Sequence, residues 1–499
     1  MSVARRSVTA AAWNIVASMC RVIVLLVRSI ILARLLPVEV FGIYAFSMSV
    51  VNLSSAIPAF GMSGAFLHRA PESQDEKQLA AIHFTLKALF TLVWAAVLLA
   101  VAMIFTQGET QLALMLLTVI YGGIHLAQTP RLILTRRVVH RRMALLQLVD
   151  ALLSSVLAIA LAWRGVTLWA LIGTDVVTLA VTILGFYIWR PVWRPHLAWS
   201  PPVMRYLLSF GSRTLVADLL MRALDRVDDL WTGLALGETA LGFYSRAYTF
   251  AIYPRLILAN PLNTVAGGTY SELKGDRIRL SKAFFRTNAF LVRTGFLLAG
   301  VMALVAPEFI RLLLGTKWLP MLDAFRLMLI YTLLDPIKIT VASVITASGA
   351  PERVVRARFI QLGVLIIGLV ILGPTFGITG VAVAVDLMLV TGILLLLWEA
   401  RRFVDFSWSR LFAVPTLALI VGLLASRLAI LLPGVLQSDW SSGGLKVAVF
   451  SVLYSGVLLA FERENVKVLL DLLRQIRSVS KAKDSEHQLL SGADIHDHN

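Results

Sequence analysis

Residues 79–105 read LAAIHFTLKALFTLVWAAVLLAVAMIF, a run that is too apolar for the surface of a soluble protein. Since an α-helix rises about 1.5 Å per residue, roughly 20 such residues cross the ~30 Å hydrocarbon core of a bilayer. Similar runs recur along the 499-residue chain, which is 58% hydrophobic and only 15% charged. They do not alternate as the strands of a β-barrel do. The sequence therefore predicts an all-α polytopic membrane protein.

We expect about fourteen transmembrane helices joined by short connections. The longest connection on the side opposite the N-terminus, near 433–443, is too short to fold into a domain. The expected spans are 9–34, 40–67, 79–105, 111–134, 143–163, 167–189, 206–234, 240–268, 283–305, 320–347, 355–373, 378–400, 410–432 and 444–461.

The distribution of Lys and Arg predicts the orientation. If the N-terminus is cytoplasmic, the cytoplasmic segments carry 27 of these residues, and the opposite side carries only Arg34, Arg164, Arg311 and Lys317. Because positive loops stay in the cytoplasm, we expect an even number of spans and both termini on that side. The same bias explains the net charge of +17 as topology and argues against a nucleic-acid partner.

The two ends of the chain and its cysteine content set further limits. Arg5 and Arg6 precede an apolar run that continues to about Leu36 without a cleavage pattern, so we expect a retained first helix rather than a signal peptide. Cys20 is the only cysteine, which excludes an intramolecular disulfide and a cysteine-type metal site. The cytoplasmic tail, 462–499, begins as a basic amphipathic stretch that lies either on the anionic leaflet or in solvent.

An internal repeat organises the spans. Residues 36–44, LPVEVFGIY, are echoed 200 residues later by LGETALGFY at 236–244. A second echo joins GVTLWA at 165–170 to GITGVA at 377–382. Chance similarity between apolar segments is the alternative. If the echoes are real, spans one to six repeat as spans seven to twelve in the same orientation, with the repeat axis along the membrane normal.

We therefore expect two pseudo-symmetric six-helix lobes around a central cavity. The N-terminal lobe is 1–189, the C-terminal lobe is 206–400, and a terminal helix pair is 410–461.

Several short segments resemble one family. ILARLLP at 31–37, running on to FGIY at 41–44, resembles the opening signature of Wzx-type polysaccharide flippases of the multidrug/oligosaccharidyl-lipid/polysaccharide exporter superfamily. LDR at 224–226 with LGFYSRAY at 241–248 looks like spans seven and eight of the colanic-acid and exopolysaccharide subgroup. LGTKWLP at 314–320 is similar to that family's entry to span ten. The resemblance covers about residues 10–460.

This resemblance implies a fold of twelve core helices plus two, similar to that of multidrug exporters. It also implies movement of an undecaprenyl-pyrophosphate-linked oligosaccharide across the inner membrane for exopolysaccharide biosynthesis. Membrane lipids, and a polysaccharide polymerase with its export machinery, are the expected partners. No organic cofactor is expected, although transport is expected to be coupled to H⁺ or Na⁺.

Ionisable residues inside spans are expensive, and each is a site hypothesis. Arg21 and Arg28 are seven residues apart and share one face of span one. Arginines compensate phosphate charge through bidentate hydrogen bonds. Spans one and seven are equivalent in the repeat, so we expect their arginines to face each other across the cavity. The candidate substrate-binding residues are Arg21, Arg28, Arg222, Arg226, Arg255 and Lys338.

The intramembrane acids are candidates for ion coupling. Asp218, Arg222, Asp225 and Asp229 follow the spacing i, i+4, i+7, i+11 and form one stripe on span seven. The alternative is that Asp218–Arg222 and Arg222–Asp225 are structural ion pairs. The coupling candidates are Asp218, Asp225, Asp175 and Asp386, with Asp150 as a further one, and the alternative for the isolated acids is structural hydrogen bonding. Arg246 is expected to anchor the membrane interface.

Three classes of function remain. The chain has no P-loop, zinc-type His pair or GxSxG motif, so we do not expect an enzyme or an ATPase. A lipid-linked polysaccharide flippase that works by alternating access is the leading hypothesis. A cation-coupled drug exporter or a lipid II flippase is the alternative within the superfamily. A membrane-embedded polysaccharide polymerase or ligase would need a larger external loop.

Overall fold

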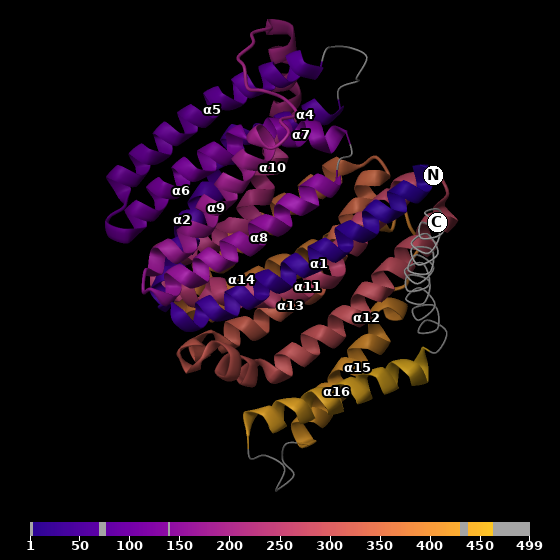
Figure 1. Ribbon diagram of the computed structural model, residues 1–499. Coiled ribbons are helices and arrows are strands. Elements are labelled where there is room, and N and C mark those ends of the chain that lie inside the picture. The colour runs from indigo at the N-terminus through magenta and orange to yellow at the C-terminus, as the bar shows by residue number, and fades with distance from the viewer. Residues whose placement is uncertain (1–2, 69–75, 138–139, 430–437, 463–499) are drawn as a thin grey trace, which may run out of the picture.

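The computed structural model describes residues 3–68, 76–137, 140–429 and 438–462, which form helices and short connections without any strand (Figure 1). The first half contains α1 (Val3–Leu35), α2 (Val38–Ser54), α3 (Ala56–Ala59), α4 (Met62–His68), α5 (Glu76–Phe105), α6 (Gly108–Leu126), α7 (Gln128–Arg136), α8 (His140–Trp163), α9 (Thr167–Ile183) and the π-helical turn η2 (Leu184–Ile188). The rest contains α10 (Pro201–Leu236), α11 (Glu238–Glu272), α12 (Arg277–Phe309), η3 (Ile310–Leu314), η4 (Thr316–Met321), α13 (Leu322–Ala347), α14 (Pro351–Ala400), α15 (Trp408–Ala429) and α16 (Asp439–Phe461).

The expected all-α membrane fold is confirmed. Ten helical segments of the described chain are long and apolar enough to cross a bilayer. One of them, α14, holds two expected spans, because its backbone leaves the helical conformation at Gly377 (φ 57°, ψ −139°). The helices α1, α10 and α11 are also long enough to cross, and each of them carries charged residues within the expected span. Within the described residues, every expected span therefore falls on helix.

In two expected spans the regular α-helical hydrogen bonding is interrupted, in each case three residues before a proline, Pro58 or Pro130. Span two is divided into α2, α3 and α4, with a turn at Ser55 and left-handed backbone at Phe60 (φ 39°). Span four is divided into α6 and α7 at Ala127. Irregular backbone at membrane depth is tolerated only where it is buried in protein or lines a cavity. We therefore expect both breaks to be covered by neighbouring helices of the first half rather than exposed to lipid.

The two halves of the repeat meet at a seam between α2 and α11. A Cβ atom added to Gly42 would lie 1.8 Å from the carbonyl oxygen of Glu238, and one added to Gly242 would lie 2.3 Å from that of Val38. Adding 200 to a residue number converts Gly42 to Gly242 and Val38 to Glu238. Each contact is therefore the repeat-related copy of the other. Such reciprocity is what a parallel repeat around an axis between α2 and α11 predicts.

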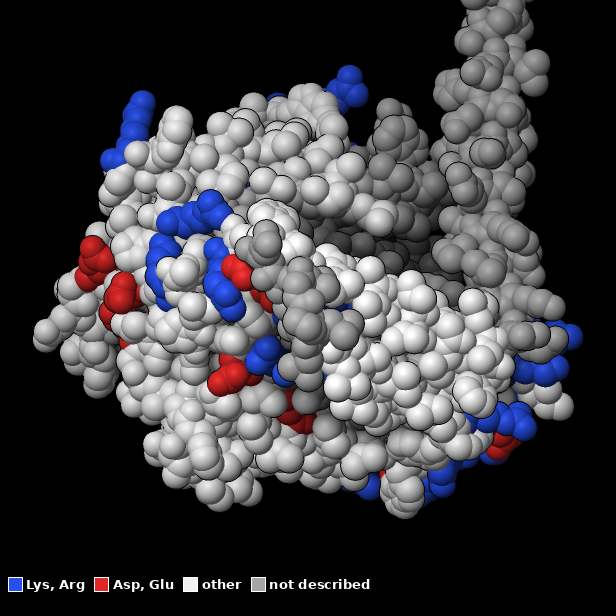
Figure 2. All heavy atoms as spheres, turned by 90° about the horizontal axis from the view of Figure 1, so that it is seen from below, with Lys and Arg blue, Asp and Glu red and all other residues white. Residues whose placement is uncertain are grey.

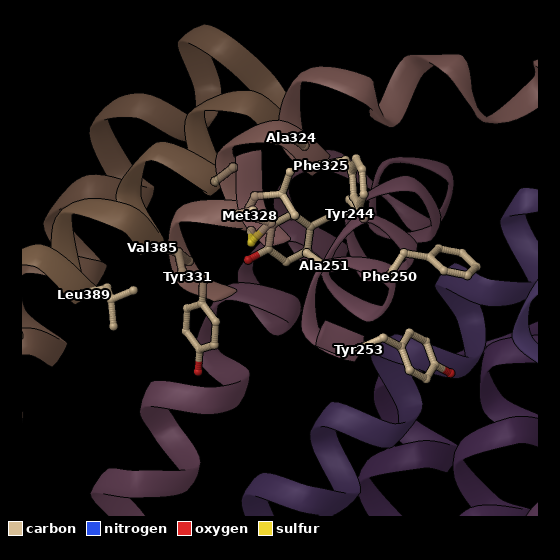
Figure 3. Close-up of a cluster of buried hydrophobic side chains, with 14 of the residues drawn as sticks. Tyr244, Phe250, Ala251, Tyr253, Ala324, Phe325, Met328, Tyr331, Val385 and Leu389 are labelled. Carbon is tan, nitrogen blue, oxygen red and sulfur yellow. The ribbon is translucent and has the colours of Figure 1, made fainter. Parts of the chain in front are cut away.

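The main hydrophobic cluster includes residues of both halves, and much of it lies in the second half. Aromatic and aliphatic side chains of α11, α13 and α14 meet there, among them Tyr244, Phe325 and Met328 (Figure 3). The outside of the molecule is apolar in many places. Seen from the side of α16, a broad part of the surface carries no charged side chain, and Lys and Arg gather beyond its borders (Figure 2). An apolar belt of this kind suits contact with lipid.

The terminal helices α15 and α16 pack on each other and on α12 (Figure 1). Two buried ion pairs fix this contact: Arg293 Nη2 lies 2.5 Å from Glu462 Oε2, and Lys446 Nζ lies 2.5 Å from Glu308 Oε1. Tyr454 also donates a hydrogen bond to the carbonyl of Arg293. The first residue of the expected tail is thus anchored, while the rest of the tail, 463–499, lies outside the described residues.

We predict that Gly42→Ala or Gly242→Ala destabilises the protein by about 1–3 kcal/mol, because the added methyl group collides with backbone rather than with a movable side chain. Thermal unfolding of the detergent-solubilised protein measures this loss. Gly363→Ala is the matched control, since a Cβ at this helical glycine meets no atom within 4 Å. Equal stability of all three variants would contradict the seam.

Candidate functional site

Two half-buried arginines from different halves of the repeat lie beside the seam. Arg28 of α1 donates through Nη1 to Ser154 Oγ of α8 at 3.1 Å. Arg246 of α11 reaches Ser29 Oγ of α1 at 3.5 Å, and its guanidinium lies 4.6 Å from the centre of the Phe41 ring. The two guanidinium groups are close enough to interact electrostatically. Arg246 was expected to anchor the membrane interface, but here its side chain lies between helices, against Ser29 of α1 and Phe41 of α2.

Two further arginines have neutral partners. Arg21 Nη1 lies 3.5 Å from Gln147 Oε1, and Arg222 Nη1 donates to the backbone carbonyl of Asn52 at 2.9 Å. Neither Asp218 nor Asp225 is within 4.0 Å ion-pair distance of Arg222, so the two ion pairs considered for span seven are not formed. Within the described chain, no carboxylate oxygen lies within 4.0 Å of Arg21, Arg28, Arg222 or Arg246, although acids act on them electrostatically from farther away: Asp150, Asp175, Asp218, Asp225 and Asp229. We call these four arginines the unpaired arginines.

The other candidate cations are paired. Arg226 Nη1 lies 3.2 Å from Asp229 Oδ2. Arg255 Nη1 and Lys338 Nζ lie 2.5 and 2.6 Å from the two oxygens of Asp335, which is 2% exposed. Both cations also lie over the Tyr331 ring at 5.7 Å. Much of their charge is therefore compensated inside the protein.

Spans one and seven, α1 and α10, were expected to face each other, but they pack mainly on other helices. α1 packs mainly on α8 and touches α11, whereas α10 packs on α14 and α2. The arginines of the two spans therefore point into different parts of the interface: Arg28 towards α8, and Arg222 towards α2.

The candidate acids have different surroundings. Asp175 is buried and accepts hydrogen bonds from Tyr44 (2.8 Å) and Tyr121 (3.3 Å), which is the structural alternative for an isolated acid. Asp386 is also buried, but neither of its oxygens has a partner in the described chain. Asp225 lines a small pocket with Tyr248 and Tyr331. The remaining two acids are Asp218, which is exposed, and Asp150, which accepts from Thr178.

The end of α1 is tied to η3 and η4 on the side opposite the start of α1. Trp318 Nε1 donates to the carbonyl of Ala33 at 2.8 Å, and Lys317 Nζ donates to that of Leu36 at 2.7 Å. In return, Arg34 Nε donates to the carbonyl of Leu313 at 2.6 Å. These bonds join the two halves of the repeat at one end of the seam. We call them the far-side lock.

A family model described as polysaccharide biosynthesis protein matches residues 31–323. The chain belongs to this family. The match runs from the end of α1 into α13 and so includes both α2 and α11. It confirms the resemblance drawn from the sequence.

Relatives of this family member are transport and biosynthesis proteins. The chain is 22% identical to the lipopolysaccharide biosynthesis protein WzxC of Escherichia coli K12, over 76% of this chain and 78% of WzxC. It is 23% identical to the teichuronic acid biosynthesis protein TuaB of Bacillus subtilis 168, over 70% and 73% of the two chains. It is 24% identical to the succinoglycan biosynthesis transport protein ExoT of Rhizobium meliloti 1021, over 58% of each. These comparisons support a membrane transporter and not an enzyme.

Solved structures confirm the fold. The lipid II flippase MurJ, in an inward closed conformation, superposes with a TM-score of 0.73 at 15% identity, over 92% of this chain and all of MurJ. An inward-facing multidrug transporter superposes with a TM-score of 0.59 at 18% identity, over 79% of this chain and 98% of that one.

The interior also holds polar residues that helical spacing alone did not single out. Asp228 is buried and accepts a 2.5 Å hydrogen bond from Tyr244 beside the Asp229–Arg226 pair. Lys87 is fully buried in α5. A lone lysine inside an apolar run meets the general criterion for an intramembrane site, so the signal for Lys87 was present in residues 79–105. No cluster of metal-ligating side chains is present among the described residues.

We predict that Asp335→Ala destabilises the protein by about 3–5 kcal/mol, because it leaves Arg255 and Lys338 as unpaired cations. Thermal unfolding in detergent tests this, with the exposed acid of the same helix, Asp323→Ala, as control. Adding Lys338→Ala should restore part of the loss. Unchanged stability of Asp335→Ala would show that the two cations do not depend on this carboxylate.

Proposed function

We propose that this protein moves an undecaprenyl-pyrophosphate-linked oligosaccharide from the cytoplasmic to the outer leaflet of the bacterial inner membrane, for exopolysaccharide biosynthesis. The names of the relatives support a polysaccharide substrate. The Lys and Arg bias supports placing both termini, and the side on which α1 starts, in the cytoplasm. The far-side lock would then be the external gate.

The unpaired arginines are the observation that carries the proposal. A cation that is withdrawn from water without a carboxylate partner is costly, and proteins keep such charges where a ligand supplies the counter-charge. A pyrophosphate carries that counter-charge and accepts bidentate hydrogen bonds from guanidinium groups. Arg28 and Arg246 come from different halves of the repeat, so one phosphate group bound between them would contact both.

Alternating access fits the way in which the seam is held. The far-side lock consists of hydrogen bonds to backbone carbonyls, which contribute about 0.5–1.5 kcal/mol net from the neutral indole of Trp318 and about 1.5–3 kcal/mol each from the charged Lys317 and Arg34. Opening on the external side therefore requires that new interactions in the open state replace these bonds and the burial of Trp318. The driving ion is proposed to be H⁺ or Na⁺, with Asp386 and Asp225 as the acids that lack a close ion pair.

The alternatives make different demands on the site. A cation-coupled drug exporter requires an acidic binding surface, which the unpaired arginines do not provide. A lipid II flippase would bind the same lipid pyrophosphate and would differ in the sugar. The sequence relatives, all named for surface polysaccharides or teichuronic acid, favour the oligosaccharide.

We predict that Arg28→Ala, Arg222→Ala and Arg246→Ala each reduce export of surface polysaccharide by about 10- to 100-fold, because each removes a charged hydrogen bond worth about 1.5–3 kcal/mol. Export is measured in a deletion strain that carries the variant, with the membrane level of the protein quantified in parallel. Lipid-linked oligosaccharide should accumulate in the inner leaflet.

Two controls accompany these variants. Arg164→Ala removes an exposed arginine between α8 and α9 and should export normally. Arg28→Lys keeps the charge but loses the bidentate fork, so it should retain an intermediate activity. Full export by a correctly folded Arg28→Ala/Arg222→Ala double variant would reject the assignment of these arginines.

A further inference from the structure

Lys87 is a lysine without a partner in the interior of the first half. Its side chain has no exposed surface, and its Nζ atom has no hydrogen-bond partner among the described residues. His83 and Thr91 lie one turn away on either side, on the same face of α5. His83 Nε2 and Thr91 Oγ1 are also buried without a partner. Three consecutive turns of α5 thus direct unsatisfied polar atoms inwards.

This face of α5 lies against both broken spans. His83 Nδ1 is 3.0 Å from Thr129 Oγ1 of α7, just after the break in span four. His125 Nε2, just before that break, is 3.1 Å from Ser55 Oγ at the break in span two. Trp94 Nε1, also on α5, donates to Ser54 Oγ at 2.9 Å. The polar cluster therefore occupies the place where both helices are interrupted.

The charged and titratable groups that face Lys87 are all basic. His83 is on its own helix, His125 comes from α6, and Arg222 comes from α10. The break between α2 and α3 contributes the hydroxyl group of Ser55, and α7 contributes that of Thr129. No carboxylate interacts with Lys87 in the described chain.

Arg222 connects this cluster to the other half of the repeat. It projects from α10 and donates to the carbonyl of Asn52, three residues before the break in span two. A second cation on Lys87 would repel Arg222 and weaken this bond. The charge of Lys87 and the contact between α10 and α2 therefore oppose each other.

We propose that Lys87 is a proton-binding site in which the amine is neutral in the present conformation and takes up a proton when α10 separates from α2. A buried ammonium ion would need a counter-charge or several hydrogen bonds, and in this arrangement Lys87 Nζ makes no hydrogen bond and meets no carboxylate among the described residues. Proton uptake converts the R–NH₂ group to R–NH₃⁺ and favours the separated state. The proposal adds an ion-coupling site to the proposed flippase and depends on it only for the use of this motion in transport.

The test measures the distance between the two halves as a function of pH, without any substrate. Spin labels are attached to cysteines replacing the exposed residues Gln78 of α5 and Glu352 of α14, in the full chain with Cys20→Ala, reconstituted in liposomes. The pH is varied from about 5 to 9, a range in which buried amines exchange protons. We expect a reversible shift to longer distances at the acidic end.

Substitutions identify the responsible group. Lys87→Met should keep the short distance at every pH, and Lys87→Arg, which stays charged, should keep the long one. Leu86→Met, a buried apolar neighbour, should titrate like the parent and shows the effect of repacking alone. His83→Gln and His125→Gln should shift the midpoint without removing the transition.

A pH-independent parent distance, or a transition that survives unchanged in Lys87→Met, would overturn the proposal. Because no substrate is present, that failure is separate from failure of the flippase assignment, which the export assay decides. If Lys87→Met does not fold, Lys87→Gln replaces it under the same criterion.

Discussion

The close approach of α2 and α11 at Gly42 and Gly242 is the constraint on which the rest of the structure depends. Neither position has room for a Cβ atom, because the carbonyl oxygens of Glu238 and Val38 occupy that space. This contact brings the two halves of the repeat together along their common axis. It also places Arg28, Arg246 and the far-side lock at the boundary between the halves, where movement of one half against the other would change their surroundings.

Charge compensation in a low-dielectric interior separates structural from functional ions in this protein. Arg293 with Glu462 and Lys446 with Glu308 are buried pairs that fasten the terminal helices. Asp335 with its two cations belongs to the same class. The unpaired arginines and Lys87 lack such partners and lie where the halves meet or where helices break. A lipid pyrophosphate would supply the counter-charge for the unpaired arginines, and Lys87 would bind a proton.

Much of the fold could be predicted from the sequence, because hydrophobic length and the Lys and Arg bias act locally. The 200-residue echo could also be recognised, since it contains the glycine that the seam requires and a tyrosine that donates a hydrogen bond to a buried aspartate in each half. The breaks at Ser55 and Ala127 had a signal that was not used, because Pro58 and Pro130 each follow three residues later and cannot donate the helical hydrogen bond to residue i−4. Partners were harder still: the bond from Arg222 to Asn52 joins residues 170 positions apart, and helical spacing alone suggested Asp218 and Asp225 instead. Lys87 was visible as a lone charge, but its lack of a partner is a property of the packed structure.

Movement at the seam is central to the proposed transport cycle, and a reversible cross-link tests it most directly. Glu39 and Thr239 are exposed, are related by the repeat and are joined by a 3.3 Å hydrogen bond across the seam. Cysteines at these two positions, in the Cys20→Ala chain, can be joined by a reducible cross-linker after reconstitution in liposomes. We predict that transfer of a pyrophosphate-linked oligosaccharide between leaflets stops on cross-linking and resumes on reduction. Transfer at the full rate by the cross-linked protein would contradict a mechanism based on movement at the seam.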